Sequence, residues 1–404
     1  MTTGADQNKI EEFLERWVDK IYPSKEGFLA ALSGKKLVIY HGVDPTAPKL
    51  HLGHSTNYLL LREFQKLGHK IILLIGDFTA RIGDPTGRAE ARKALTEKEV
   101  RKNYKDYKKQ AGKILDFSSR NNPVQIRFNS KWFSKMKMSD IMELTAKYTQ
   151  GKMIKRNMFQ ERLKNNQEIY LSEFLYPLFQ GYDSVAMNVD VEVGGKDQTF
   201  NMLVGRDLLK AYKGKEKFVV TTLLLENPKT GKKLMSKSEG NFIALDEEPN
   251  QMYGKVMALP DEAIIPCFNL CTAISSKDIK EIEDDLRFNK INPKDVKARL
   301  AGEIVGFYHN KKAAENAEKE FNRVFREREM PTDIPAIKIP EGKIPILDLL
   351  VNAKTVLSKS EAKRLIMQKG VKIDNKVEGD WRKIIDVKKG MTIQAGRRKF
   401  VKIA

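Results

Sequence analysis

The sequence contains few cysteines, few histidines and no long apolar run. Its two cysteines, Cys267 and Cys271, stand in one apolar helical stretch with no further metal ligands nearby. We therefore interpret them as buried, reduced thiols. No apolar run approaches the ~20 residues that a membrane-spanning helix needs. The start, Met1 to Asn8, is polar and lacks the apolar centre of a secretory signal. We therefore expect a cytoplasmic protein with no membrane partner.

Acidic residues are also scarce relative to basic ones. The chain has 73 Lys and Arg against 53 Asp and Glu, a formal net charge of +20 over 404 residues. Distributed positive charge attracts phosphate backbones, so a polyanionic partner is favoured. Basicity alone leaves a solvated surface or membrane contact open. The length allows two or three domains with a sizeable core.

Within the stretch from Tyr40 to His54, His51 and His54 stand three residues apart, in a chain that has only five histidines. A short apolar run over 37–40 predicts a buried strand before it, and residues 55–67 have helical apolar spacing. The histidines then stand at a helix start, where backbone N–H groups and the helix dipole favour an anion. Gly53 leaves no side chain between the two imidazoles. The pattern indicates a phosphate site, although a metal-ligand pair or two surface histidines fit the spacing alone.

Alternating apolar runs and helical stretches predict an α/β fold with a doubly wound, Rossmann-like parallel sheet. Ligands of such sheets bind beyond the carboxyl ends of the strands, where His51 to His54, residues 83–85 and residues 194–198 fall. One crevice could therefore collect these three segments. The expected strands cover residues 36–41, 70–76, 124–129, about 185–193 and 218–224.

The chain divides into five expected segments. They are an N-terminal helical segment (1–35), a catalytic domain (36–245) with a helical insertion at about 132–182, an α-helical domain (246–330), a proline-rich linker (331–344) and a small α+β domain (345–404).

The small C-terminal domain begins with a well-marked helix. Ser358 to Glu361 fit a capping box, and Gly370 is placed to end the helix. A strand and turn are expected over 371–377. With Lys363, Arg364 and Lys369 on its helix, the domain resembles the S4 RNA-binding fold, which implies contact with RNA. A basic helix and hairpin without a ligand fits the pattern alone equally well.

His51 to His54, taken with Met235-Ser236-Lys237-Ser238, resembles the two ATP motifs of class I aminoacyl-tRNA synthetases. From residue 36 to the end, the chain resembles bacterial-type tyrosyl-tRNA synthetases with a C-terminal S4-like domain. The segments that carry the resemblance are 40–54, 82–88, 176–183 and 194–198. The resemblance implies a ligase that activates L-tyrosine with ATP to tyrosyl-adenylate and pyrophosphate. Tyrosine then passes to the 3′-terminal ribose of tRNA(Tyr). It also implies that the helices over 246–330 bind the anticodon end of the tRNA. Mg²⁺ with ATP, no structural metal and a homodimer are implied as well.

The resemblance also implies roles for individual residues. Tyr40 and Asp183 match the groups that bind the phenol hydroxyl, which agrees with the need for buried polar groups that reject phenylalanine by ~10⁴–10⁵. The other implied tyrosine-binding residues are Asp84, Tyr176, Gln180 and Thr79 at the ammonium, Gln198 at the carboxyl group, and Asn129, with Trp132, behind the site. The implied catalytic residues are His51, His54, Lys237, Arg88 and Arg92. ATP would also contact Gly42, Asp44, Gly53, Gly195, Asp197, Met235, Ser236 and Ser238.

Two positions depart from the family pattern. Leu234 replaces the usual first lysine of the second ATP motif, with Lys232 and Lys233 just before it. Glu192 stands where many relatives have glutamine.

Three other functions compete with tyrosine activation: a tryptophan-specific synthetase, a non-catalytic RNA-binding relative and a small-molecule adenylyltransferase.

Overall fold

The computed structural model describes residues 4–86, 94–235, 242–325, 334–396 and 399–404. The chain forms two compact units, Met1–Glu318 and Lys319–Ala404, so the boundary falls within helix α17 (Lys311–Phe325). Each unit is described by itself below. Within the described ranges, no helix has the length and apolar character to cross a membrane.

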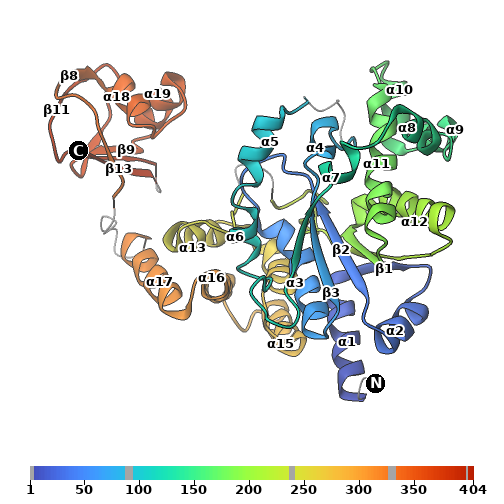
Figure 1. Cartoon of the computed structure of the whole chain (residues 1–404). Coiled ribbons are helices and arrows are strands. Elements are labelled where there is room, and N and C mark those ends of the chain that lie inside the picture. The colour runs from blue at the N-terminus through green and yellow to red at the C-terminus, as the bar shows by residue number, and fades with distance from the viewer. Residues whose placement is uncertain (1–3, 87–93, 236–241, 326–333, 397–398) are drawn as a thin grey trace. The chain divides into compact units, whose positions relative to one another are not determined.

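A six-stranded sheet of order β1-β6-β5-β2-β3-β4 forms the centre of the larger unit (Figure 1). All neighbours from β6 to β4 pair in parallel, which confirms the predicted doubly wound α/β class. Each of the five strands from β2 to β6 overlaps the residues where the sequence predicts one. Their bounds are β2 Val38–Val43, β3 Lys70–Ile75, β4 Gln125–Phe128, β5 Val191–Gly195 and β6 Phe218–Thr222.

The N-terminal segment differs from the helices expected there, because it also contains strand β1 (Val18–Tyr22). This strand pairs antiparallel with β6, with Tyr22 opposite Val219. It lies at the sheet edge and is only partly buried, so it lacks the apolar run that marks the inner strands. Helices α1 (Gly4–Trp17) and α2 (Lys25–Gly34) flank it.

The winding of the sheet reverses between β2 and β5. From β2 the chain moves outward to β3 and β4, and it then returns to place β5 on the other side of β2. Tyr40 on β2 lies opposite Glu192 on β5. A crevice forms beyond the carboxyl ends of strands at such a reversal, so this is where the fold predicts a ligand.

Helices cover both faces of the sheet, with α3 on one side of β2 and β3 and with α11 and α12 on the other (Figure 1). Residues 130–164 form the short helices α7–α10, and α11 follows them. The helices between β2 and β6 are α3 Leu52–Lys66, α4 Thr79–Ile82, α5 Glu97–Tyr104, α6 Tyr107–Ala111, α7 Ser130–Phe133, α8 Met138–Thr145, α9 Gln150–Ile154, α10 Asn157–Lys164, α11 Leu171–Met187 and α12 Thr199–Lys213.

Helices α13 to α16 and the first part of α17 belong to the same compact unit as the sheet. Helix α14 packs against both α1 and α3, and its Cys271 thiol contacts the Leu52 carbonyl at the start of α3. Cys267 and Cys271 are buried and free, as the sequence predicts. The bounds are α13 Pro249–Met257, α14 Ile264–Cys271, α15 Ser276–Arg287, α16 Pro293–Tyr308 and α17.

The C-terminal unit has its own apolar core, which includes Ile346, Leu349, Ile366 and Ile393. A five-stranded sheet of order β10-β9-β12-β13-β7, a two-stranded sheet β11-β8 and two helices enclose it. The bounds are β7 Ala336–Ile337, β8 Gly342–Pro345, α18 Ile346–Asn352, α19 Lys359–Met367, β9 Val371–Ile373, β10 Lys376–Glu378, β11 Ile384–Val387, β12 Thr392–Ala395 and β13 Lys399–Ile403.

Two local expectations for this unit need correction. Strands β7 and β8 fall largely inside the segment that the prolines predict to be a linker, because proline is tolerated at strand ends and sheet edges. Ser358 caps α19 as expected, accepting from the Glu361 amide at 3.2 Å. However, Lys369, with φ of 55°, takes the left-handed conformation that ends the helix, and Gly370 then donates to the Leu365 carbonyl at 2.8 Å.

Arg16 at the end of α1 ties α14 to the N-terminal segment. Its guanidinium donates to the carbonyls of Asn269 (2.6 Å), Phe268 (2.9 Å), Thr272 (2.7 Å) and Ile274, where α14 ends. Helix ends leave such carbonyls without partners. Burial lowers the pKa of Arg16 to about 10, so the side chain keeps its charge at neutral pH.

We expect Arg16→Met to lower the free energy of unfolding of the larger unit by about 2–4 kcal/mol, because several half-buried carbonyls lose a charged donor. Urea unfolding followed by tryptophan fluorescence measures this. Arg101→Met is the control, since Arg101 is exposed and pairs with Glu97 along α5. Equal stabilities for the two variants would contradict the role given to Arg16.

Candidate functional site

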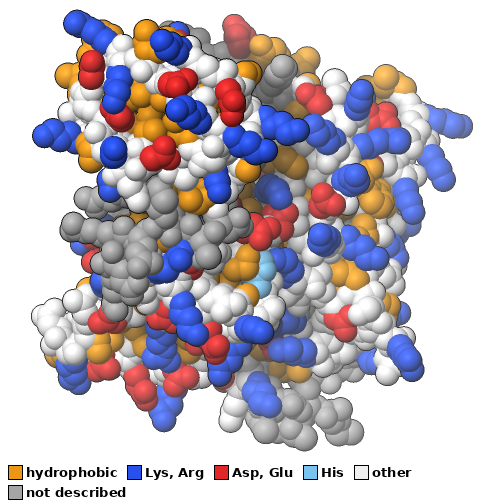
Figure 2. Space-filling view, turned by 90° about the vertical axis from the view of Figure 1, so that its left-hand side faces the viewer, with side chains coloured by type: hydrophobic (Ala, Val, Ile, Leu, Met, Phe, Trp, Pro, Cys, Tyr) orange, Lys and Arg blue, Asp and Glu red, His pale blue; other side chains and the backbone are white. Residues whose placement is uncertain are grey.

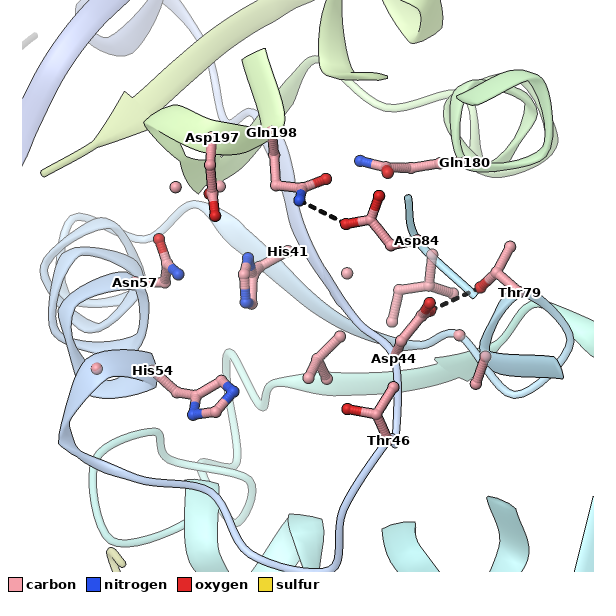
Figure 3. Close-up of a pocket in the computed structure, with 18 of the residues that line it drawn as sticks. His41, Asp44, Thr46, His54, Asn57, Thr79, Asp84, Gln180, Asp197 and Gln198 are labelled. Atoms are coloured by element: carbon pink, nitrogen blue, oxygen red, sulfur yellow. Dashed lines mark hydrogen bonds between the residues drawn. The ribbon is translucent and has the colours of Figure 1, made fainter. Parts of the chain in front are cut away.

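A cleft of about 900 Å³ opens beyond the carboxyl ends of β2 and β5. Figure 3 shows His54, Asn57 and Asp197 toward one end of it and Asp44, Thr79 and Gln180 toward the other. Most residues predicted for the site line this single cleft. They are Tyr40, Gly42, Asp44, His51, Gly53, His54, Thr79, Asp84, Tyr176, Gln180, Asp183, Gly195, Asp197, Gln198 and Met235.

Both histidines of the first motif have a fixed ring orientation. His51 Nδ1 accepts from the Gly53 amide at 3.1 Å, and His54 Nδ1 accepts from the His51 amide at 3.2 Å. A neutral imidazole whose Nδ1 accepts carries its proton on Nε2. The two rings lie 3.9 Å apart between centroids. Two Nε2–H donors are therefore held side by side at the helix start.

The amides at the start of α3 are engaged within the protein, which corrects the expectation that they point outward unpaired. Leu52 N donates to Ile243 O at 3.1 Å, Gly53 N donates to His51 Nδ1, and His54 N donates to His51 O at 2.8 Å. His51 itself caps the helix, so the donors offered to an anion are imidazoles. Gly53 is needed because a Cβ there would lie 2.9 Å from His51 Cε1.

Asp44, in the loop after β2, joins two elements at one end of the cleft. Its Oδ1 accepts from Thr79 Oγ1 at 2.7 Å and its Oδ2 accepts from the Tyr176 hydroxyl at 2.8 Å. A charged acceptor between two hydroxyls is well placed for a cation. Asp44 thus lies with the residues expected at the substrate ammonium, which sequence reasoning did not indicate.

Asp183 on α11 is a buried carboxylate with two donors behind it. Trp132 Nε1 donates to its Oδ1 at 2.9 Å, and Asn129 Nδ2 donates to its Oδ2 at 3.3 Å. Asn129 is fully buried and also donates to Thr79 Oγ1 at 3.0 Å, so it supports the cleft from behind. Burial raises the pKa of Asp183 well above its ordinary value, and the two N–H donors oppose this shift.

Amide side chains connect the middle of the cleft. Gln198 Nε2 donates to Asp84 Oδ2 at 2.7 Å (Figure 3). Asn201 Nδ2 on α12 donates to Gln198 Oε1 and to Gln180 Oε1, each at 3.0 Å. Gln180 Nε2 donates to Glu192 Oε1 at 3.3 Å. Gln180, Gln198 and Asp84 are thus held in one connected set, with Asn201 as a link that the motifs did not reveal.

Two further residues that sequence reasoning missed, Ser184 and Lys217, are buried beneath the cleft. The Tyr40 hydroxyl lies 2.9 Å from Ser184 Oγ, and Lys217 Nζ donates to the same oxygen at 2.6 Å. Lys217 also forms an ion pair with Glu192, and both are almost completely buried. A lysine before an apolar strand reads as exposed in sequence, so its burial had no local signal.

The ATP-motif residues lie partly within the described structure. Lys233 Nζ forms an ion pair with Asp197 Oδ2 at 2.8 Å at the cleft, whereas Leu234 is buried. Gly195 is close to the same carboxylate, since a Cβ there would lie 2.7 Å from Asp197 Oδ1. Arg88, Arg92, Ser236, Lys237 and Ser238 lie outside the described residues. Among the described residues, no group of three His, Cys, Asp or Glu side chains could hold a metal.

Basic side chains are spread over the face in Figure 2. In the C-terminal unit, Lys363, Arg364 and Lys369 are exposed on or just after α19. Lys363 Nζ lies 4.0 Å from the centroid of the Trp381 ring. These residues form a basic surface of their own unit.

Comparisons with known proteins agree with this geometry. A family model of class I tRNA synthetases (tryptophan and tyrosine) matches residues 32–326. The tyrosine–tRNA ligase of Moorella thermoacetica is 44% identical over 397 residues, 96% of this chain and 94% of that protein. The ligase of Thermotoga maritima is 45% identical over 382 residues, 94% of each chain. A C-terminally truncated mitochondrial tyrosyl-tRNA synthetase of Aspergillus nidulans superposes with a TM-score of 0.66 at 23% identity, covering 78% of this chain and 94% of that one, which supports the fold.

Gly76 after β3 provides a stability test of the site geometry. A Cβ there would overlap Asp44 Oδ1 and lie 2.5 Å from Thr79 Oγ1. We expect Gly76→Ala to lower the free energy of unfolding by about 1–3 kcal/mol, because the Asp44–Thr79 hydrogen bond must break. Gly254→Ala is the matched control: Gly254 lies within α13 with open space around it, and alanine there should stabilise by about 0.5–1 kcal/mol. Urea unfolding of both variants checks the opposite signs, and a stabilised Gly76→Ala protein would contradict this packing.

Proposed function

The chain belongs to the class I tRNA synthetases for tryptophan and tyrosine, and from this membership we propose that it activates L-tyrosine with ATP and attaches it to tRNA(Tyr). The observation that carries the proposal is one cleft with a buried hydroxyl–carboxylate pair, Tyr40 and Asp183, and with the paired histidines. Each end matches one substrate.

The Tyr40 and Asp183 end fits a phenol. A phenol hydroxyl accepts one hydrogen bond from Tyr40 and donates one to Asp183. Phenylalanine would leave both buried groups without partners, which a buried polar site penalises strongly. An indole offers only a single N–H donor, so the pair favours tyrosine over tryptophan.

The substrate ammonium fits the acidic wall formed by Asp44 and Asp84. Tyr176 and Thr79 hold Asp44, and Gln198 holds Asp84, so both carboxylates are positioned before the substrate arrives. Such preorganisation leaves little reorganisation at the moment of reaction. Gln180 and Gln198 complete the amino-acid site in the proposal.

Activation proceeds by in-line attack of the tyrosine carboxylate on the α-phosphorus of ATP. The bond to the β-phosphate bridge oxygen breaks, and pyrophosphate leaves. The carboxylate is already ionised, so no general base is needed. His51 and His54 donate from Nε2 to phosphate oxygens as charge develops. We include Mg²⁺ in the proposal as a counterion that neutralises charge on the phosphates.

The rest of the proposed ATP site consists of residues 194–198 and the second ATP motif. Asp197 accepts from the ribose hydroxyls once its ion pair with Lys233 opens, and Gly195 allows close approach of the nucleotide. Lys233 then provides the charge that Leu234 lacks at the pyrophosphate. Roles for Lys237, Arg88 and Arg92 on the leaving group stay predictions.

In the second step, a ribose hydroxyl at the 3′ end of tRNA attacks the tyrosyl carbonyl, and AMP leaves. Lys363, Arg364 and Lys369 contact RNA phosphates in the proposal. The proposal also includes a homodimer in the cytoplasm. Exposed apolar side chains of Met138, Met142 and Leu171 on the insertion support contact with a second copy.

The test of the function is ATP–pyrophosphate exchange with each amino acid in turn, without tRNA. We expect exchange with tyrosine, and exchange lower by at least about 10⁴ with phenylalanine at equal concentrations. Exchange with tryptophan in place of tyrosine would reassign the substrate. Exchange with no amino acid would favour an RNA-binding protein without catalysis.

Discrimination against phenylalanine should depend on pH through Asp183. Burial raises the pKa of this carboxyl group, and only its ionised form accepts the phenol proton. The ratio of kcat/KM for tyrosine over phenylalanine should therefore fall as pH is lowered. Asp183→Asn does not titrate, so its ratio should be about 10- to 100-fold lower and constant with pH.

His54→Ala is the control for this measurement. It should slow exchange with both amino acids while leaving the pH dependence of their ratio in place, because His54 faces phosphate. A ratio that stays constant with pH in the unchanged protein would remove Asp183 from its role.

A further inference from the structure

Lys217 is a buried cation beneath the amino-acid end of the cleft. It directly precedes β6 and is 0% exposed, and its ammonium contacts both the Glu192 carboxylate and Ser184 Oγ (2.6 Å). Glu192 lies opposite Tyr40 across the β2–β5 pair, so the ion pair sits directly beside the residue that faces the phenol.

The fold makes room for this charge. A Cβ on Gly205 of α12 would lie 2.6 Å from Lys217 Nζ and 3.2 Å from Gly181 Cα of α11. The two helices therefore approach closely through glycines, and the ammonium occupies the space beside them. Burial lowers the pKa of Lys217, and the Glu192 carboxylate opposes this shift. Buried ion pairs often stabilise no more than apolar residues of the same size, so stability alone does not account for this one.

Two hydrogen-bonded paths lead from Lys217 to opposite ends of the amino-acid site. The first passes through Ser184 to the Tyr40 hydroxyl, 2.9 Å away. The second passes through Glu192 to Gln180 Nε2 at 3.3 Å. From Gln180 it continues through Asn201 to Gln198 and Asp84. One buried ammonium thus supports the groups that face the phenol and the groups that face the ammonium of the substrate.

We propose that Lys217 is a positioning residue for amino-acid selection, acting through Ser184 on Tyr40 and through Glu192 on Gln180. This inference rests on the proposed tyrosine activation and assigns a role to a residue outside both ATP motifs. Lys217 touches neither substrate, so its effect is confined to how tyrosine is held.

The first path sets the direction of the Tyr40 hydrogen. An ammonium only donates, so Ser184 Oγ accepts from Lys217. The Ser184 O–H then has two acceptors within reach, the Tyr40 oxygen at 2.9 Å and Glu192 Oε2 at 3.5 Å, and the shorter contact favours Tyr40. Tyr40 then keeps its O–H for the phenol oxygen of the substrate, while Asp183 accepts the phenol proton. Without Lys217, nothing in this path donates to Ser184 Oγ, so the Tyr40 O–H is favoured to turn toward that oxygen and away from the substrate.

The second path holds Glu192 in place as an acceptor for Gln180. Removing Lys217 alone leaves a buried carboxylate with no counterion, which is strongly unfavourable. Glutamine at 192 avoids that charge, and its amide both accepts from Gln180 and donates toward Ser184. Removing the charges at both 217 and 192 should therefore restore much of the tyrosine binding that Lys217→Met loses.

The test compares Lys217→Met with Lys217→Met/Glu192→Gln in tyrosine-dependent ATP–pyrophosphate exchange. For Lys217→Met we expect KM for tyrosine to rise about 10- to 100-fold and the tyrosine-to-phenylalanine ratio to fall, with KM for ATP within about twofold. In the double variant, KM for tyrosine should return to within about tenfold of the unchanged protein.

Arg162→Met is the matched control. Arg162 forms the other almost fully buried ion pair of the described residues, with Glu173 at 2.8 Å, and neither residue lines the cleft. Its loss should lower the unfolding midpoint as much as Lys217→Met does, without changing the tyrosine-to-phenylalanine ratio. A folded Lys217→Met protein with unchanged KM for tyrosine overturns the inference.

A second variant covers the case in which Lys217→Met does not fold. Ser184→Ala keeps the Lys217–Glu192 ion pair and removes the path to Tyr40, together with the long 3.5 Å contact from Ser184 Oγ to Glu192. It should therefore lower the tyrosine-to-phenylalanine ratio, and an unchanged ratio overturns the inference. Tyrosine-dependent exchange by the unchanged protein distinguishes a failure of the proposed function from a failure of the role given to Lys217. If it shows no tyrosine-dependent exchange, the proposed function itself fails, whatever the variants do.

Discussion

Strands β2 and β5 hydrogen-bond to each other where the winding of the sheet reverses, and the site depends on this pairing. It places Tyr40 opposite Glu192 and directs the loops after both strands into one cleft. The first ATP motif, His51 to His54, is far from residues 194–198 in the chain. The two segments meet at the cleft because the carboxyl ends of parallel strands lie at the same edge of a sheet. The cleft is therefore a consequence of strand order.

Buried polar groups are the second constraint. Asp183 and Glu192 lie in the interior, where an unpaired charge is strongly unfavourable, and each is matched by donors. Satisfying these groups also fixes their direction, so that Tyr40, Asp44 and Asp84 are oriented before any substrate binds. The same hydrogen bonds therefore contribute to the stability of the fold and to the selectivity of the site. Substitutions of residues buried behind the cleft are expected to alter amino-acid recognition.

Fold class and most of the cleft could be predicted from the sequence, since both leave local signals. Apolar runs mark the inner strands, and the spacing around His51 and His54 marks a helix start. The edge strand β1 left no such signal because it is only partly buried. The amides at the start of α3 were wrongly expected to lack partners within the protein. One of them bonds to Ile243, which is distant in sequence, and another to the His51 ring, whose position depends on its rotamer.

The sequence by itself determined the alternation of strands and helices and the two histidines at a helix start. Each of these is a pattern within one element, where neighbours along the chain are neighbours in space. Tertiary structure alone decided that Lys217 is buried against Glu192 and Ser184 and that Asp44 joins Thr79 to Tyr176. These partners come from different elements, and only strand order and helix packing bring them within hydrogen-bonding distance.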